Sequence, residues 1–145
     1  MADGTDKEEI LFKQYELMVN STQQVTTWRQ TSNGFYITLN TAILAILSGL
    51  FEVPDVAHLL LGVAGIAISY FWYMHIDYFS KLNKAKFRVV GEIEEKLPVK
   101  AFIDEHKYFK AERCRNATSI EKAIVGIFII LYLLALANSI ISLGL

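Results

Sequence analysis

The stretch GFYITLNTAILAILSGLFE, residues 34 to 52, decides the fold of this 145-residue chain. It is apolar enough to cross a lipid bilayer, yet polar and small side chains recur along it. Alternate steps of four and three residues from Gly34 reach five residues of this kind: Thr38, Thr41, Ala45, Ser48 and Glu52. In a helix of 3.6 residues per turn, such steps stay on one face. The question is what this polar face contacts.

The composition points to a membrane protein. Hydrophobic residues make up 53% of the chain, which is too high a share for an ordinary soluble domain. The chain is also too short for two such domains. Three stretches carry the excess: 34–51, 57–79 and 123–145. About 20 helical residues cross a hydrocarbon core of about 30 Å, so each stretch can span, the first only just. We therefore predict an all-α integral membrane protein with three transmembrane helices.

The rest of the chain divides around these spans. Pro54 cannot continue a helix and Glu52 and Asp55 resist burial in lipid, so they end the first span in a short turn. The predicted segments are a cytoplasmic N-terminal amphipathic helix (1–33), transmembrane helices 1 and 2 (34–79), a cytoplasmic helical segment (80–122) and transmembrane helix 3 (123–145).

The basic residues predict the orientation. Of 14 lysines and arginines, eleven lie between Ser80 and Lys122, three precede the first span, and the link 52–56 has none. The positive-inside rule then places the N-terminus and the 80–122 segment in the cytoplasm and the C-terminus outside. The net charge of −1 gives no case for nucleic acid as a partner.

Amphipathic patterns predict how the cytoplasmic helices pack. An apolar seam and an opposite polar face follow the N-terminal helix: Leu11, Tyr15, Met18 and Val25 against Asn20, Gln24, Thr27 and Thr31. The polar face keeps the phase of the stripe in residues 34 to 52. A second apolar seam beyond the second span should pack on the N-terminal helix: Leu82, Ala85, Val89, Ile93 and Leu97.

Motifs for catalysis, metals or cofactors are missing from the sequence. The histidines, His58, His75 and His106, lie in separate segments, and there is no His-Glu-x-x-His, cysteine pair or glycine-rich phosphate loop. His75 and Asp77 fit an interfacial aromatic belt better than a functional site. Glu92, Glu94 and Glu95 fit a solvated helix face. We expect no catalytic residue, no metal site, no cofactor and no enzymatic activity.

Two stretches carry a family resemblance: LNKAKFRVVGEIEEKLP, residues 82 to 98, and RQTSNGFYITLNTAIL, residues 29 to 44. They resemble the RipA-type family of small bacterial inner-membrane proteins, which are octameric, over most of residues 10 to 110. The family pattern matches at nine positions: Leu82, Asn83, Ala85, Lys86, Phe87, Ile93, Glu94, Leu97 and Pro98. The chain departs from it at Glu105-His106, where the family has Glu-Trp.

The resemblance implies a homo-oligomeric ring, an octamer, in the cytoplasmic (inner) membrane of a bacterium. It implies no settled activity. The architecture is also loosely similar to the octameric membrane pore that accompanies Cas13b, which would suit a phage-defence or stress effector. A cytoplasmic protein partner and membrane lipids are further candidate partners.

Two functions remain open from the sequence. In a ring, the polar face of the first span can line a pore, with Thr38, Thr41, Ala45, Ser48 and Glu52 as pore-lining candidates. Otherwise it is a helix-packing seam, as the spacings Ala45-x-x-x-Gly49 and Gly65-x-x-x-Ser69 would also allow. The alternative function is a non-conducting scaffold whose cytoplasmic helices recruit a partner or organise the envelope.

The predicted topology can be tested directly. Reporters active in only one compartment, fused at Met1 and at Leu145, should report the cytoplasm and the exterior respectively, because eleven basic residues lie between spans two and three. If both ends report the same compartment, the chain crosses the membrane an even number of times, and one of the three predicted spans is wrong.

Overall fold

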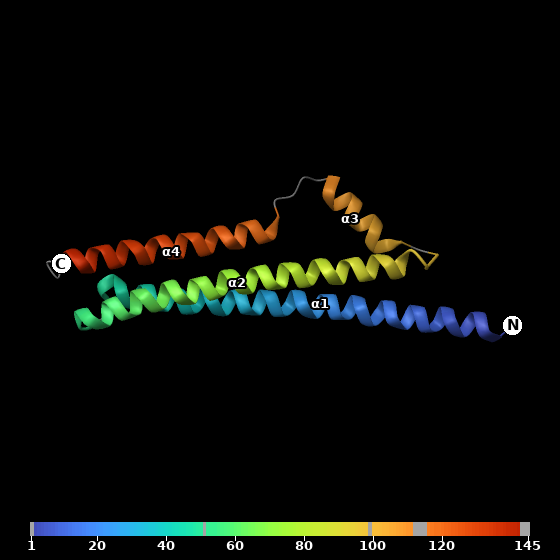
Figure 1. Ribbon diagram of the computed structural model, residues 1–145, viewed down its shortest axis with the longest axis horizontal. Helices are drawn as coiled ribbons and strands as arrows, with labels where there is room; N and C mark the ends of the chain where they lie inside the picture. Colours follow the sequence, from blue (N-terminus) through green and yellow to red (C-terminus); the bar gives the residue numbers. More distant parts are fainter. Residues whose placement is uncertain (1, 51, 99, 112–115, 143–145) are drawn as a thin grey trace. The chain divides into compact units, whose positions relative to one another are not determined.

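The computed structural model describes residues 2–50, 52–98, 100–111 and 116–142, and all its elements in these ranges are helical (Figure 1). They are α1 (Ala2–Ala45), a short π-helix η1 (Ile46–Leu50), α2 (Asp55–Glu94), α3 (Ala101–Ala111) and α4 (Ala117–Ser142). The all-α prediction is confirmed for the described part of the chain.

The turn between α1 and α2 is made by one glycine and one proline. Gly49, with a φ of 84°, is in the left-handed region, which only glycine enters readily, and it ends the helix inside η1. Pro54 then starts α2, since its carbonyl oxygen accepts hydrogen bonds from Ala57 N (2.8 Å) and His58 N (3.1 Å). A Cβ on Gly49 would meet no atom within 4 Å. Gly49 therefore serves the turn, and it does not form a packing notch with Ala45.

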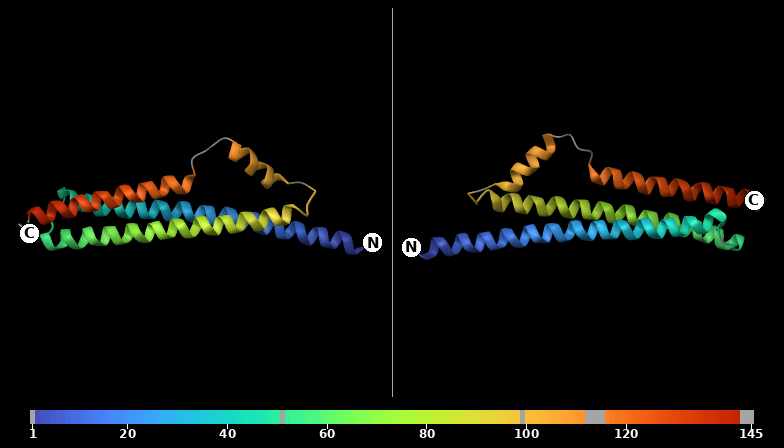
Figure 2. Two further views of the ribbon diagram at one scale, coloured as in Figure 1. Left: turned by 45° about the horizontal axis from the view of Figure 1, so that its top comes forward. Right: turned by 180° about the vertical axis from the view of Figure 1, so that it is seen from behind.

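The chain forms two compact units, each made of segments distant in sequence (Figure 2). We call Met1–Arg29 with Tyr78–Asn116 the charged unit, and Gln30–Asp77 with Ala117–Leu145 the apolar unit. α1 and α2 each contribute to both units, α3 lies in the charged unit and α4 in the apolar one.

The core of the apolar unit is built on aromatic side chains. Trp72, Ile76 and Val125 are buried, and Tyr36 stacks on Trp72 with ring centroids 5.8 Å apart. Two glycines of α2, Gly62 and Gly65, are buried where the chain meets α4. The predicted small-residue spacing from Gly65 to Ser69 is thus a real packing surface.

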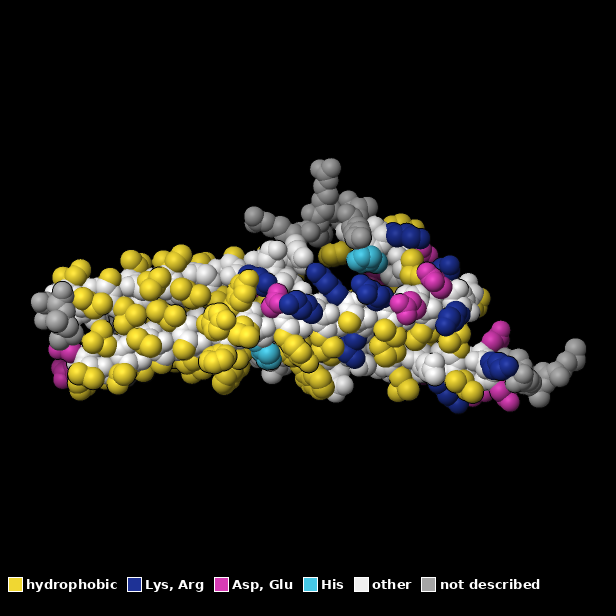
Figure 3. Space-filling model, in the orientation of Figure 1, with side chains coloured by type: hydrophobic (Ala, Val, Ile, Leu, Met, Phe, Trp, Pro, Cys, Tyr) yellow, Lys and Arg dark blue, Asp and Glu magenta, His cyan; other side chains and the backbone are white. Residues whose placement is uncertain are grey.

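Two helices, α2 and α4, are long and apolar enough to cross a membrane. Most of the apolar window of each is half-buried or exposed, with 28% buried in α2 and only 11% in α4. Figure 3 shows apolar side chains covering this part of the molecule's visible face. A surface of this kind suits lipid or neighbouring subunits and not water.

The charged unit confirms one predicted seam and corrects the other. In α1, Thr22 and Val25 are buried, and Leu11, Tyr15 and Met18 are half-buried, while the opposite polar series is exposed. On α2 and just beyond it, the predicted seam is right only in part: Leu82, Ile93 and Leu97 are half-buried, but Ala85 and Val89 are exposed. The buried face of α2 here consists of Phe79, Val90 and Glu94. Apolar residues recur with a helical period along this part of α2, but two overlapping faces of the helix fit that period. The sequence alone does not decide which of them is buried.

Packing between α2 and α4 should be sensitive to a single methyl group. A Cβ at Gly65 would lie well inside van der Waals contact with the Tyr132 ring. Gly65→Ala should therefore destabilise the protein by about 1–3 kcal/mol, the usual cost of overpacking. Thermal unfolding in detergent measures this, with Gly126→Ala as the matched control because nothing lies within 4 Å of its Cβ position. Equal melting temperatures for both variants would contradict the observed packing.

Candidate functional site: the outward polar face of α1

The predicted pore-lining residues lie together on the outside of the apolar unit. Thr38, Thr41, Ser48 and Glu52 are exposed, and Ala45 is half-buried. We call these five residues the polar stripe. The first two lie on α1, Ser48 lies in η1, and Glu52 follows it. The described chain therefore leaves the stripe open to whatever surrounds the subunit.

The opposite side of α1 holds the helix in the subunit. Asn40 is completely buried, Ile43 nearly so, and Asn33 and Tyr36 are half-buried. Since each residue turns a helix by about 100°, Thr41 lies about 100° and Thr38 about 160° around the axis from Asn40. The stripe thus points away from the helices on which α1 packs.

Two of the three hydroxyl groups of the stripe are hydrogen-bonded within their own helix. Thr38 Oγ1 donates to the carbonyl of Gly34 (2.9 Å), and Ser48 Oγ donates to that of Ala45 (2.8 Å). A hydroxyl group that is bonded in this way can face either a packed neighbour or water. The stripe is compatible with a packed neighbour, a water-filled lumen, or both along its length.

A buried polar network that the sequence analysis missed lies behind the stripe. Asn40 Oδ1 accepts hydrogen bonds from Ser69 Oγ of α2 and from the Tyr132 hydroxyl of α4, each at 2.9 Å. Asn40 Nδ2 donates to the carbonyl of Tyr36 (2.8 Å). One amide therefore joins α1, α2 and α4. Its signal in the sequence was an asparagine within an apolar stretch, on the face opposite the stripe.

A second polar connection lies seven residues earlier on the same face of α1. Asn33 Oδ1 accepts a hydrogen bond from Trp72 Nε1 (2.8 Å), and Asn33 Nδ2 donates to Glu121 Oε1 (2.9 Å). Glu121 lies near the start of α4, so this hydrogen bond joins α4 to α1, again opposite the stripe.

A charged residue near the start of α4, Lys122, contacts α2 in the apolar unit. Lys122 Nζ lies 2.9 Å from Asp77 Oδ1 and 4.5 Å from the centroid of the Tyr73 ring. His75 packs its ring edge-on against Tyr36, with centroids 5.8 Å apart. These contacts suit an interfacial belt that anchors α4 beside α2, as amphipathic side chains do at a membrane surface.

The expectation of a solvated acidic face in the charged unit is wrong for Glu94. Glu92 and Glu95 are exposed, but Glu94 is 1% exposed. Its carboxylate accepts hydrogen bonds from the backbone N–H groups of Phe102 and Ile103 (both 2.9 Å), and so caps the N-terminus of α3. A cap contributed by a distant residue leaves no signature in local sequence.

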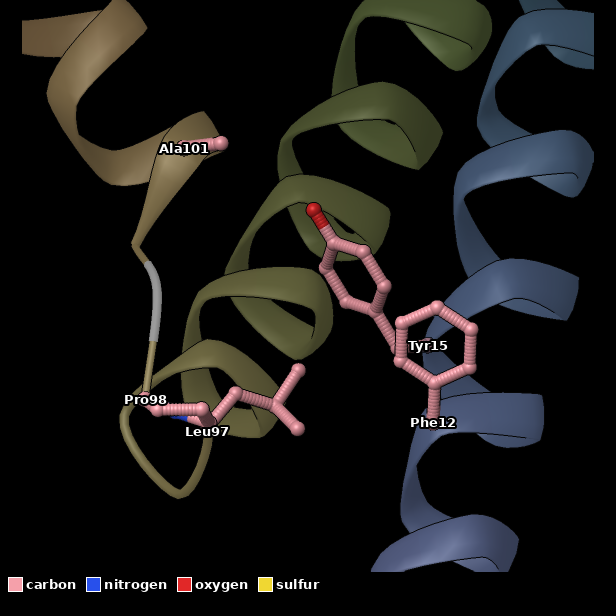
Figure 4. A pocket seen from close by; sticks show the side chains of 5 residues that line it. All are labelled: Phe12, Tyr15, Leu97, Pro98 and Ala101. Carbon is pink, nitrogen blue, oxygen red and sulfur yellow. The ribbon is translucent and has the colours of Figure 1, made fainter.

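Tyr15 completes this arrangement from α1. Its hydroxyl donates to Glu94 Oε1 at 2.7 Å, and burial together with this carboxylate raises the Tyr15 pKa to about 12. Tyr15 also lines a small cavity with Phe12, Leu97, Pro98 and Ala101 (Figure 4). Apart from the Tyr15 hydroxyl, which Glu94 already binds, these lining side chains are apolar.

The comparison with protein-family models gives the decisive finding. A family model described as the octameric membrane protein family matches residues 12–141. The chain belongs to the octameric membrane protein family (8xMP). No curated protein and no solved structure matches it. Membership in 8xMP confirms the predicted kind of family and makes this a self-associating membrane protein, with α2 and α4 as the apolar helices that could cross the membrane.

Removing the Asn40 side chain should weaken the three-helix packing of the apolar unit. Asn40→Ala removes the acceptor of the Ser69 hydroxyl and one of two acceptors of the Tyr132 hydroxyl, which keeps the Asn40 backbone carbonyl (3.1 Å), and this should cost about 1–3 kcal/mol. Unfolding in detergent measures the loss, and Asn20→Ala, on the exposed face of the same helix, is the matched control.

A double-mutant cycle makes this prediction specific to the network. Tyr132→Phe should cost less in the Asn40→Ala background than in the wild type, because the shared hydrogen bond is already gone. Strictly additive losses would show that the two side chains do not act together.

Proposed function

We propose that this protein is a pore of the bacterial cytoplasmic membrane and not an enzyme, with the polar stripe of α1 lining an octameric ring. The observation that carries the proposal is that four of the five stripe residues are exposed, on the side of the helix away from the buried residues Asn40 and Ile43. A row of threonine, serine and carboxylate groups is a poor surface for lipid. A neighbouring copy or water must cover it.

The proposal needs a third membrane crossing in addition to α2 and α4. We assign it to the end of α1 together with η1, residues 34–50, which leads through the Gly49 turn into α2. Three crossings put the N-terminus and the charged unit in the cytoplasm and the C-terminus outside. The eleven basic residues between Ser80 and Lys122 support this orientation.

Orientation also restricts the symmetry of an octamer. Subunits that all point the same way in a membrane cannot be related by a two-fold axis lying in its plane, because that operation turns a subunit upside down. Eight equivalent subunits must then form a cyclic ring around an axis along the membrane normal. Each subunit presents one face to this axis, and the stripe is the polar candidate among the exposed membrane-facing surfaces.

A second candidate function, the scaffold, draws support from α3. Tyr108 and Phe109 near the end of this helix are 75% and 60% exposed in the charged unit. Exposed aromatic side chains of this kind are common at protein-protein interfaces. A ring that displays eight copies of α3 could recruit a cytoplasmic partner without conducting.

Conductance of stripe variants distinguishes the pore from a packing seam. If the stripe faces an axis, Glu52 forms a ring of carboxylates at the outer mouth that raises the local cation concentration. Glu52→Lys should then abolish or reverse cation preference in planar bilayers, with Glu52→Gln intermediate. Ala45→Leu should lower conductance, whereas Ala137→Leu, on the exposed surface of α4, should leave it unchanged.

Oligomer size must be measured on the same variants by native mass spectrometry. At a packed seam, Ala45→Leu would instead reduce the octamer, and Glu52→Lys would be almost silent. An intact wild-type octamer that conducts at no applied voltage would favour the scaffold.

A further inference from the structure

We infer that the pore is wide, and that it passes hydrated ions and small water-soluble molecules with weak selectivity. This inference rests on the proposed pore and adds its substrate class. The observations behind it are the octameric family, the position of the stripe opposite Asn40, and the small size of the stripe side chains. Each of these three observations bears on the minimum width of the lumen.

The number of subunits sets the width. Packed helices lie about 8–10 Å apart, so eight adjacent α1 helices in a ring have their axes roughly 10–13 Å from the centre. A helix with its side chains has a radius of about 5–6 Å. The remaining lumen is roughly 10 Å across or more, about as wide as an α-helix. Any other helix placed between neighbouring α1 helices would widen it further.

The stripe cannot fill this space. Its side chains on α1 and η1 are those of threonine, alanine and serine, which extend little beyond the backbone. The hydroxyls of Thr38 and Ser48 are also engaged with the carbonyls of Gly34 and Ala45. Selectivity by dehydration requires oxygen atoms that surround an ion at coordination distance. Groups on opposite sides of an eight-fold lumen are too far apart for that.

Among solutes small enough to enter the lumen, only the field of charged groups can then discriminate. Glu52 is exposed and would be repeated eight times at the outer mouth. The Debye length at physiological salt is about 8 Å, longer than the lumen radius of roughly 5 Å, so the field of the ring reaches the centre but is weakened there by salt. We expect a cation preference of about tenfold or less, decreasing as salt is raised.

A flux experiment tests the width. The octamer is reconstituted into phosphatidylcholine vesicles that contain potassium ions, the small dye calcein and a large dextran. We expect potassium and calcein to leave the same vesicles, while the dextran stays. Vesicles with Ala45→Leu should release calcein more slowly, and those with Ala137→Leu at the wild-type rate.

Thiol labelling tests the same width without relying on conduction. In a Cys114→Ser background, Thr41→Cys places one thiol per subunit on the stripe, and Ile127→Cys places one on the exposed apolar surface of α4. A bulky, membrane-impermeant maleimide should attach at least one label at position 41 of every octamer, counted by native mass spectrometry, since one level of the lumen has no room for eight. Position 127 should remain unlabelled in the vesicles.

The outcomes separate the two proposals. Potassium flux with calcein retained, or octamers without any label at position 41, would overturn the wide lumen but leave a narrow pore. An intact octamer that releases neither potassium nor calcein would overturn the proposed pore, and this inference with it.

Discussion

The hydrogen bonds of one buried amide fix the orientation of α1, and the rest of the apolar unit depends on that orientation. Asn40 has its side-chain oxygen bound by Ser69 and Tyr132, from two different helices. A buried amide left without partners is costly, above all in lipid, so α1 has one favourable rotation about its axis. In that rotation Thr38 and Thr41 must point outward. The rotation of α1 that buries Asn40 in its hydrogen-bond network is the same rotation that exposes the stripe.

Much of the architecture was readable from the sequence because it follows from length and periodicity. The apolar runs of α2 and α4, the break at Pro54 and the polar phase of α1 are local patterns. The buried face of α2 was not readable, since Ala85 and Val89 fit an apolar period as well as Phe79 and Val90 do.

The polar contacts escaped prediction for a different reason. From the sequence, Glu94 is expected on the surface, and only the packing of α3 against it explains its burial. Asn40 is expected to be unfavourable in an apolar helix, and only its hydrogen bonds with two hydroxyl groups explain its position. Both satisfy partners at least 8 residues away in sequence, up to 92 for Tyr132. Pairings of this kind are set by tertiary packing, which no local pattern encodes.

The contacts between α2 and α4 also bear on how the protein meets membranes of different thickness. Gly65 receives the Tyr132 ring, Gly62 receives Leu136, and Lys122 pairs with Asp77. These points pin the two helices at both ends, so neither can slide along the other by a turn. A subunit held in this way has a fixed hydrophobic length. When lipid and protein differ in thickness, the bilayer must stretch or compress around it, at a cost that grows with each ångström of mismatch.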